Sequence, residues 1–186
     1  MSSAALKGRR ILAIVTNYGV EQDELVVPVA HLRSSGAKVT IAALKGKKKI
    51  QTLTGNKEPG ATVKPDIKLG EVDAKSYDLL LIPGGTLNAD ALRLSDEALA
   101  LVRTFAGSGK PIAAICHAPW ALVSADVVRG KTLTSYASLE TDIRNAGAEW
   151  KDEPVVVDHE GGYALVTSRD PGDLDDFLGA IDVLLG

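Results

Sequence analysis

The sequence predicts a three-layer α/β/α sandwich, in which helices cover both faces of a mostly parallel sheet. Short apolar runs rich in Ile, Val and Leu, which are typical of buried strands, recur along the chain. Several of them are followed by segments with the apolar spacing of one helix face. Strands that alternate with helices in this way are typical of the doubly wound, flavodoxin-like class.

The order of elements along the chain supports this class. Strands are expected at 9–16, 38–43, 77–82, 112–115, 131–133, 155–157 and 164–167, with short antiparallel strands near 49–53 and 62–63. Helices are expected at 21–35, 96–108, 117–125 and 173–185, with Ser95 capping the second of them. Neither a linker nor an internal repeat divides the sequence, so we expect a single domain over residues 1–186.

Composition and charge exclude several classes of protein. The chain has 186 residues and a net charge of −3, so it lacks the excess of basic residues typical of nucleic-acid-binding domains. No apolar run reaches the length of a membrane span, and residues 1–7 have no signal-peptide core. The single cysteine cannot form an internal disulfide. We therefore expect a cytoplasmic protein without nucleic-acid or membrane partners.

The single cysteine lies at the strongest functional signal of the sequence. Cys116 follows the strand predicted at 112–115, and the small residues Ala114 and Ala118 flank it at two positions on either side. This pattern resembles a nucleophile elbow, a sharp strand-to-helix turn that tolerates only small flanking residues. A helix that begins at His117 would favour the thiolate and lower the pKa of Cys116. The alternative is a small buried core residue, which is common for free cysteine.

Two further loops are expected at the same edge of the sheet, because the carboxyl ends of parallel strands meet there. Glu24 lies one turn into the first predicted helix, where burial would raise its pKa and make it a protonated partner of the thiolate. A plain carboxylate at a helix start is the alternative interpretation. Gly84 and Gly85 follow the strand at 77–82, and their N–H groups can serve as oxyanion donors or simply form a turn.

The histidines do not indicate a metal site. The chain has three of them and one cysteine, and they are not spaced as metal ligands. His31 is expected to be structural within the first helix, and His159 to be exposed in a hairpin turn. We expect neither a metal nor a cofactor.

Four segments in order resemble the PfpI family. They read VEQDELVVP at 20–28, LLIPGG at 80–85, AAICHAP at 113–119 and VTSRDPGDL at 166–174. That family of intracellular proteases and stress proteins is related to the human parkinsonism-associated deglycase and to class I glutamine amidotransferases. The resemblance extends from Arg10 to about Leu184, and the sequence departs from the family's Cys-His-Gly-Pro only by having Ala118 in place of the glycine.

The resemblance implies a role for each matching residue. Cys116 matches the nucleophile, His117 the histidine after it, and Glu24 the glutamate that hydrogen-bonds the cysteine. Gly84 and Gly85 match the oxyanion loop, and Tyr136 matches a tyrosine near the pocket. An acidic residue of a neighbouring subunit pairs with the histidine in such oligomers. Asp90 aligns with that acid if one residue is inserted before it. The resemblance therefore also implies a homodimer or a larger even-numbered oligomer.

The activities implied by the resemblance share one chemical step, the attack of a thiolate on a carbonyl carbon. They are those of a deglycase, a glutathione-independent glyoxalase and a cysteine peptidase, with small aldehyde adducts favoured over peptides as substrates. All would serve general protection against stress. The alternative from another class is a redox sensor or chaperone that acts through oxidation of Cys116 without turnover.

Overall fold

The computed structural model describes residues 5–46 and 48–186, so the expectation about the N-terminal segment concerns residues that lie partly outside this range. Among the described residues, one sheet has the strand order β11-β12-β8-β7-β1-β3-β6. In chain order these strands are β1 (Arg10–Val15), β3 (Lys38–Ala43), β6 (Ile67–Lys68), β7 (Leu79–Ile82), β8 (Ile112–Ile115), β11 (Val155–Asp158) and β12 (Leu165–Ser168). All neighbours in it pair in parallel except β11 and β12.

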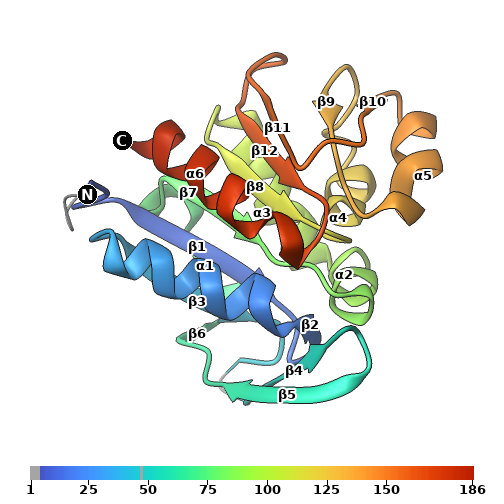
Figure 1. Ribbon diagram of the computed structural model, residues 1–186. Helices are drawn as coiled ribbons and strands as arrows, with labels where there is room; N and C mark the ends of the chain where they lie inside the picture. The colour runs from blue at the N-terminus through green and yellow to red at the C-terminus, as the bar shows by residue number, and fades with distance from the viewer. Residues whose placement is uncertain (1–4, 47) are drawn as a thin grey trace.

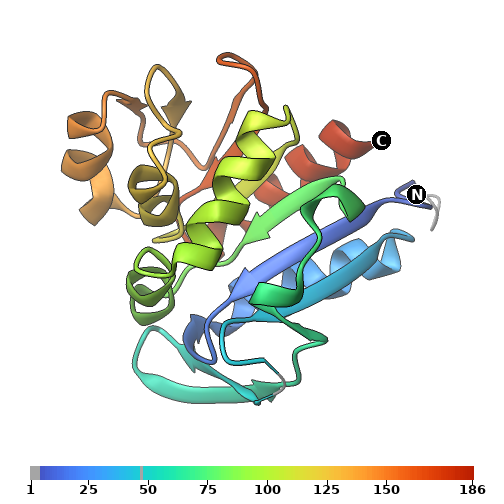
Figure 2. The same cartoon turned by 180° about the vertical axis from the view of Figure 1, so that it is seen from behind.

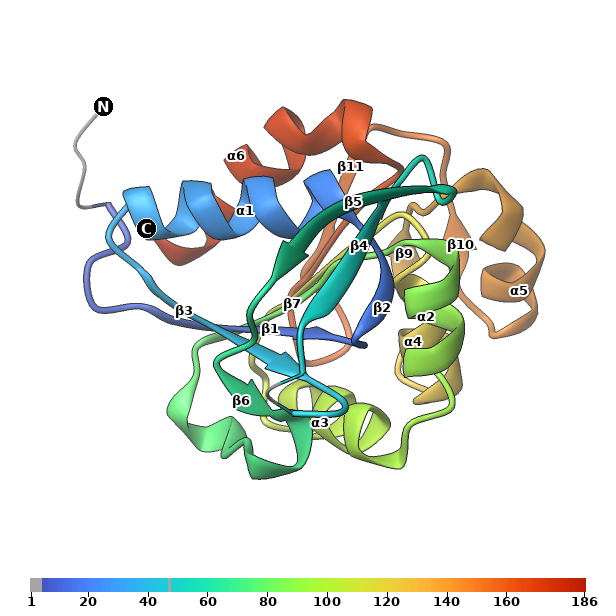
Figure 3. The same ribbon diagram turned by 90° about the horizontal axis from the view of Figure 1, so that it is seen from below.

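Helices cover both faces of this sheet, as Figure 3 shows with the sheet edge-on. On one face lie α1 (Gln22–Ser34) and α6 (Leu174–Leu185). On the other face lie α2 (Thr86–Leu92), α3 (Asp96–Gly107), α4 (Pro119–Ser124) and α5 (Glu140–Asn145). Figure 2, the reverse view, shows this face. Alternate residues of β1 enter the two cores: Ile11 packs with the first pair of helices and Leu12 with the second group. The predicted three-layer sandwich is confirmed.

The described residues also form two smaller sheets and four short 3-10 helices. The first small sheet consists of β2 (Tyr18–Glu21), β4 (Ile50–Thr54) and β5 (Glu58–Val63), and the second of β9 (Thr132–Leu133) and β10 (Glu149–Trp150). The 3-10 helices are Leu69–Glu71, Ala74–Ser76, Ala137–Leu139 and Pro171–Asp173. The antiparallel pairing of β4 with β5 confirms the expected excursion at 45–70.

Most predicted elements lie within two residues of the observed ones, and Ser95 caps α3 by accepting the N–H of Ala98. At the edge of the sheet, one predicted boundary was wrong and one helix was missed. The helix after Cys116 begins at Pro119 instead of His117, because the intervening residues form the turn. The segment after Gly85 forms α2, for which no helix was predicted.

The strand order explains where a site can form. The strands β3-β1-β7-β8-β12 have the flavodoxin-like order 2-1-3-4-5, which reverses direction at β1. The carboxyl ends of β1, β7 and β8 therefore face one crevice, and Figure 1 shows these strands directed toward the edge where β2 and α2 lie. None of the helices among the described residues is long and apolar enough to cross a membrane.

A buried ion pair fastens the β11–β12 hairpin to β9. Lys131 Nζ lies 3.1 Å from Asp158 Oδ1, and the two side chains are 2% and 6% exposed. Nζ also donates to the carbonyl of Tyr163 and lies 4.1 Å from the centre of the Tyr163 ring. Asp158 Oδ2 accepts the N–H of Thr132 at 2.6 Å. Removal of either charge would leave the other buried and unpaired.

We expect Lys131→Ala to destabilise the fold by about 3–5 kcal/mol, the usual cost of leaving one charge of a buried pair unpartnered. Urea unfolding followed by circular dichroism measures this loss. The control is Glu140→Ala, which removes a half-exposed i,i+4 partner of Arg144 and should cost less than about 0.5 kcal/mol. Equal losses in the two variants would contradict the structural role of the Lys131 pair.

Candidate active site

Cys116 occupies a sharp turn directly after β8. Its φ of 63° lies in the left-handed region, which residues other than glycine rarely adopt. Its N–H donates to the carbonyl of Ser168 at 3.0 Å, and its carbonyl accepts the N–H of Tyr136 at 2.9 Å. Ala118 closes the turn by donating its N–H to Ile115 at 3.0 Å. The backbone conformation expected of a nucleophile elbow is therefore present, and it is held from both sides.

Glu24 reaches this turn from α1. Its side chain is fully buried, and Oε2 accepts the N–H of Gly84 at 2.7 Å. A Cβ atom on Gly84 would lie 2.6 Å from Oε2 of Glu24 and 2.9 Å from Cβ of Cys116, so only glycine fits between the two side chains. Burial raises the pKa of Glu24 to about 8, while hydrogen bonds with Cys116 and with the N–H of Gly84 oppose the shift. The sequence-based expectation of a buried carboxyl group with a raised pKa is confirmed.

The environment of the thiol differs from the one predicted. Cys116 is 2% exposed, and burial raises its pKa. The neighbouring Glu24 raises this pKa further, and the N–H groups of Gly85 and His117 lower it. The predicted lowering of the pKa was wrong because α4 begins three residues after Cys116, and burial outweighs the few N–H groups in reach.

Loss of one proton from the buried pair leaves a single negative charge on either Cys116 or Glu24. A thiol beside a carboxylate has the same net charge as a thiolate beside a carboxylic acid, so pH alone does not select between the two forms. Hydrogen bonds make the selection. The N–H groups of Gly85 and His117 favour the thiolate, and the N–H of Gly84 favours the carboxylate. The reactive form therefore depends on the geometry of these three donors.

His117 contacts the thiol and packs against two aromatic rings. Its Nδ1 is 3.1 Å from Sγ of Cys116, and the side chain is 4% exposed. The ring stacks on Tyr136 with centroids 4.6 Å apart at 23°, and Trp120 lies 5.4 Å away. Burial lowers the pKa of His117 and so favours the neutral imidazole. Tyr136 itself is half exposed and forms the outer side of the site.

Three contact residues of the site were not predicted from the sequence. Nε2 of His117 lies 3.4 Å from Oγ1 of Thr86 and 3.5 Å from Oγ of Ser138. Asn88 is fully buried, accepts the N–H of Thr16 at 2.7 Å, and donates to the carbonyls of Pro83 and Gly84. Only Thr86 had a local signal, because it directly follows Gly85.

The two glycines of the loop after β7 have different partners. The N–H of Gly84 is bonded to Glu24, whereas that of Gly85 lowers the pKa of the Cys116 thiol. Gly85 has a φ of 85°, and a Cβ there would lie 2.4 Å from the carbonyl oxygen of Gly19. Packing and backbone conformation thus both require glycine at this position.

Asp90 lies apart from these residues. It is exposed on α2, and its carboxylate has no hydrogen bond or ion pair with another described residue. Within one chain, the structure therefore brings Cys116, His117, Glu24, Gly84, Gly85 and Tyr136 together and leaves Asp90 outside. Its predicted role depends on a second subunit and stays a prediction.

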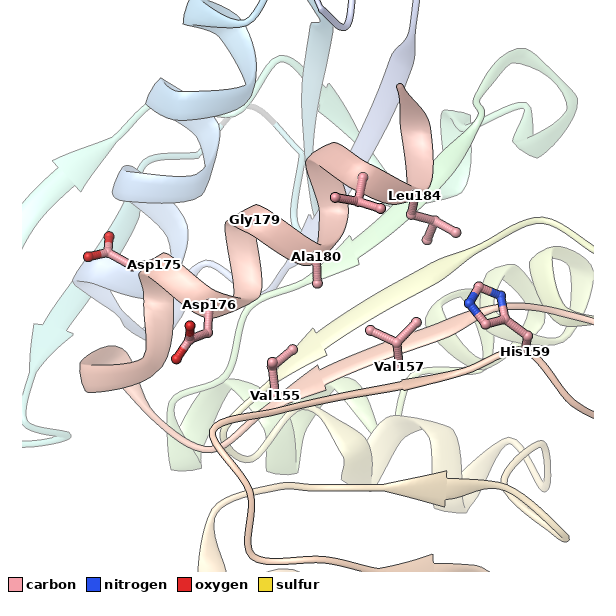
Figure 4. A pocket seen from close by; sticks show the side chains of 9 residues that line it. Val155, Val157, His159, Asp175, Asp176, Gly179, Ala180 and Leu184 are labelled. Atoms are coloured by element: carbon pink, nitrogen blue, oxygen red, sulfur yellow. The ribbon is translucent and has the colours of Figure 1, made fainter. Parts of the chain in front are cut away.

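The two other histidines occupy the expected surroundings. His31 joins α1 to α6 through Nε2, which lies 2.8 Å from Asp182 Oδ2. His159 is exposed and lines a groove of about 640 Å³ between β11 and α6, together with Val157 and Asp176 (Figure 4). None of the predicted site residues lines this groove. Within 5–46 and 48–186, no group of three His, Cys, Asp or Glu side chains is arranged to hold a metal ion.

The fold and the site define a class, a doubly wound α/β protein with a cysteine on a strained strand–helix turn beside a buried glutamate. Comparison with known proteins identifies the family. The model of the DJ-1/PfpI family matches residues 9–182, and the chain belongs to this family.

Individual relatives agree with this assignment. The chain is 39% identical over 161 residues to a deglycase of Thermococcus kodakarensis, covering 87% of this chain and 90% of that protein. It is 41% identical over 170 residues to protein/nucleic acid deglycase 2 of Escherichia coli, covering 91% and 93%. Among solved structures, DJ-1β of Drosophila melanogaster matches with a TM-score of 0.83 and 32% identity, covering 95% and 90% of the two chains.

The raised pKa of Glu24 makes the stability of the protein depend on pH. Between its ordinary value of 4.5 and about 8, folded Glu24 keeps a proton that the unfolded chain has lost. Stability should therefore fall as pH rises through this window, by about 1.4 kcal/mol per unit. Glu24→Gln has no such proton. We expect its stability relative to wild type to improve by on the order of 2 kcal/mol between pH 5.5 and 7.5 in urea titrations.

Asp23→Asn is the matched control, because Asp23 is the exposed neighbour of Glu24 on the same helix turn. Its stability relative to wild type should change little over the same interval. A parallel response of both variants to pH would show that the buried carboxyl group is not the source of the effect.

Proposed function

We propose that this protein is an enzyme that uses Cys116 as a nucleophile on small aldehydes and their adducts, as a deglycase or a glutathione-independent glyoxalase. The observation that carries the proposal is the placement of Cys116 on a left-handed turn, against His117 and beside the buried, protonatable carboxyl of Glu24. Two relatives named deglycases, each covered to at least 90% of its length, support the same activity. A buried, unpaired cysteine is compatible with the reducing cytoplasm, to which we assign the protein.

The first step follows from the proton shared by the pair. The thiolate of Cys116 adds to the aldehyde carbon, the C=O bond becomes a C–O single bond, and the oxygen takes the proton of Glu24. The products are a hemithioacetal and the carboxylate of Glu24. We assign the developing negative charge to the N–H groups of Gly85 and His117, because both lower the pKa of the Cys116 thiol and so favour negative charge at this point. Gly84 contributes by holding Glu24.

The two activities differ in how the aldehyde reaches Cys116 and share the second step. For a hemiaminal adduct, the C–N bond breaks and the amine leaves with the hydroxyl proton, which regenerates the free 2-oxoaldehyde. For a 2-oxoaldehyde, the proton on the hemithioacetal carbon moves to the neighbouring carbonyl carbon, and water then hydrolyses the resulting thioester to a hydroxy acid. The neutral imidazole of His117, 3.1 Å from the sulfur, is the base that we assign to these proton transfers.

Burial of the nucleophile favours small substrates over peptides. The Cys116 side chain is only 2% exposed, and His117 beside it is only 4% exposed. An extended peptide presents a carbonyl flanked by chain on both sides and needs an open nucleophile. A small aldehyde requires far less space around the sulfur than a peptide does.

Turnover of methylglyoxal tests the proposal. Wild type should convert it to lactate, and Cys116→Ala should reduce the rate to that of buffer, since the nucleophile forms the covalent intermediate. Asp96→Asn, which changes an exposed acid at the start of α3 outside the residues around Cys116, is the control and should keep the wild-type rate. Casein hydrolysis that depends on Cys116 would favour the peptidase. An absence of turnover, with Cys116 oxidised by peroxide to sulfinic acid, would favour the redox sensor.

We further propose that the active form is a homodimer in which Asp90 of one copy acts on the site of the other. Exposed apolar side chains lie beside Asp90 on the same segment, with Leu87 49% and Leu94 78% exposed. Apolar surface of this kind is typical of contact surfaces between proteins. Asp90 could approach His117 of a second copy from the side of Thr86 and Ser138, where Nε2 lies.

Asp90→Asn tests this assembly. Light scattering should give at least a dimer for wild type, and the variant should turn over methylglyoxal about 10-fold or more slowly at unchanged stability, as expected for loss of a charged hydrogen bond. Asp96→Asn, an exposed acid at the start of α3, is the control and should behave as wild type. A fully active monomer would contradict the proposal.

A further inference from the structure

The β4–β5 hairpin is fastened to the start of α1. Glu21 is buried, and its two carboxylate oxygens accept the N–H groups of Gly55 at 3.0 Å and Asn56 at 2.9 Å. Gln22 accepts the N–H of Ala61 at 2.7 Å on the other strand of the hairpin. The segment that carries Glu24 into the site therefore also sets the position of the hairpin tip.

The tip of the hairpin reaches the loop after β7. Asn56 has a φ of 59°, a left-handed conformation that asparagine tolerates better than most residues. Its Oδ1 accepts the N–H of Thr86 at 2.7 Å, and so caps the first residue of α2 from a different part of the chain. Gly85, the residue just before α2, has no side chain that could form this cap.

Thr86 and Gly85 connect this loop to His117 and Cys116, as Gly84 connects it to Glu24. Oγ1 of Thr86 lies 3.4 Å from Nε2 of His117, and the backbone N–H of Gly85 lowers the pKa of the Cys116 thiol. Both positions depend on the peptide between Gly85 and Thr86, whose N–H is the one held by Asn56. Movement of this peptide would change the orientation of His117 and weaken a donor that favours the thiolate.

We propose that Asn56 is a positioning residue, which sets the reactivity of Cys116 by holding the Gly85–Thr86 peptide against the thiol and His117. It acts through these residues and does not touch the sulfur. The inference rests on the proposed function for its effect on turnover. Its effect on the thiol itself can be measured without any substrate.

Loss of a helix cap alone would lower stability, so the experiment must separate reactivity from stability. Asn56→Gly keeps the left-handed backbone and removes the amide, and Asn56→Asp keeps an acceptor oxygen at the same place. Ser95→Ala removes the cap of α3, at the opposite end of α2 from His117, and is the matched control. Circular dichroism gives the Tm of each variant.

The main measurement is the rate constant for oxidation of Cys116 by hydrogen peroxide, which intact-mass analysis monitors over a range of pH. Cys116→Ala is the blank. We expect Asn56→Gly to react about fivefold more slowly than wild type at pH 7, as for loss of one hydrogen bond. The midpoint of the curve of oxidation rate against pH should also shift. Asn56→Asp should recover most of the rate. Ser95→Ala should lose stability and keep the wild-type rate. In methylglyoxal turnover, Asn56→Gly should lower kcat and change KM little.

Each outcome decides the question. A wild-type oxidation rate in Asn56→Gly, a loss of rate in Ser95→Ala equal to that in Asn56→Gly, or no recovery in Asn56→Asp would each overturn the proposal. If wild type does not turn over methylglyoxal, the proposed function fails, and the oxidation rates still decide the role of Asn56.

Discussion

The contact between the carboxyl group of Glu24 and the thiol of Cys116 imposes conditions on every loop around it. A carboxyl group without exposure to water costs free energy unless it keeps its proton or gains donors. Here the N–H of Gly84 bonds one oxygen, and Cys116 lies beside the carboxyl group, across the space that a Cβ atom on Gly84 would fill. Only a glycine at position 84 leaves room for both groups, and only a left-handed turn at Cys116 directs the sulfur toward them.

The strained turn is held by the sheet and by the segment before α5. Ser168 at the end of β12 accepts the N–H of Cys116, and Tyr136 donates its N–H to the carbonyl of Cys116. A non-glycine residue in this conformation costs about 1–3 kcal/mol, so it persists only where its surroundings leave no alternative. The same segment brings the ring of Tyr136 onto His117. One segment of the chain thus both fixes the backbone of Cys116 and covers the ring of His117.

The protonation of Glu24 and Cys116 is controlled by groups in their immediate surroundings. Burial raises the pKa of both Glu24 and Cys116, and a few backbone N–H groups decide which of them holds the proton. A shift of a fraction of an ångström in such donors changes the balance, since hydrogen-bond strength falls steeply with geometry. This sensitivity explains why contacts beyond the first layer, such as those of Asn88 and Asn56 with the Gly-Gly loop, matter to the site.

By itself, the sequence determined the layered fold, the strand–helix turn at Cys116, and the burial of Glu24 with its raised pKa. These depend on local patterns: apolar runs, small residues around the cysteine, and the meeting of parallel strand ends at one edge. Only the tertiary structure decided that the pKa of Cys116 is raised, that Gly84 bonds Glu24, and that Thr86, Ser138 and Asn88 surround the site. Burial and hydrogen-bond partners depend on residues far apart in the chain, which no local pattern specifies.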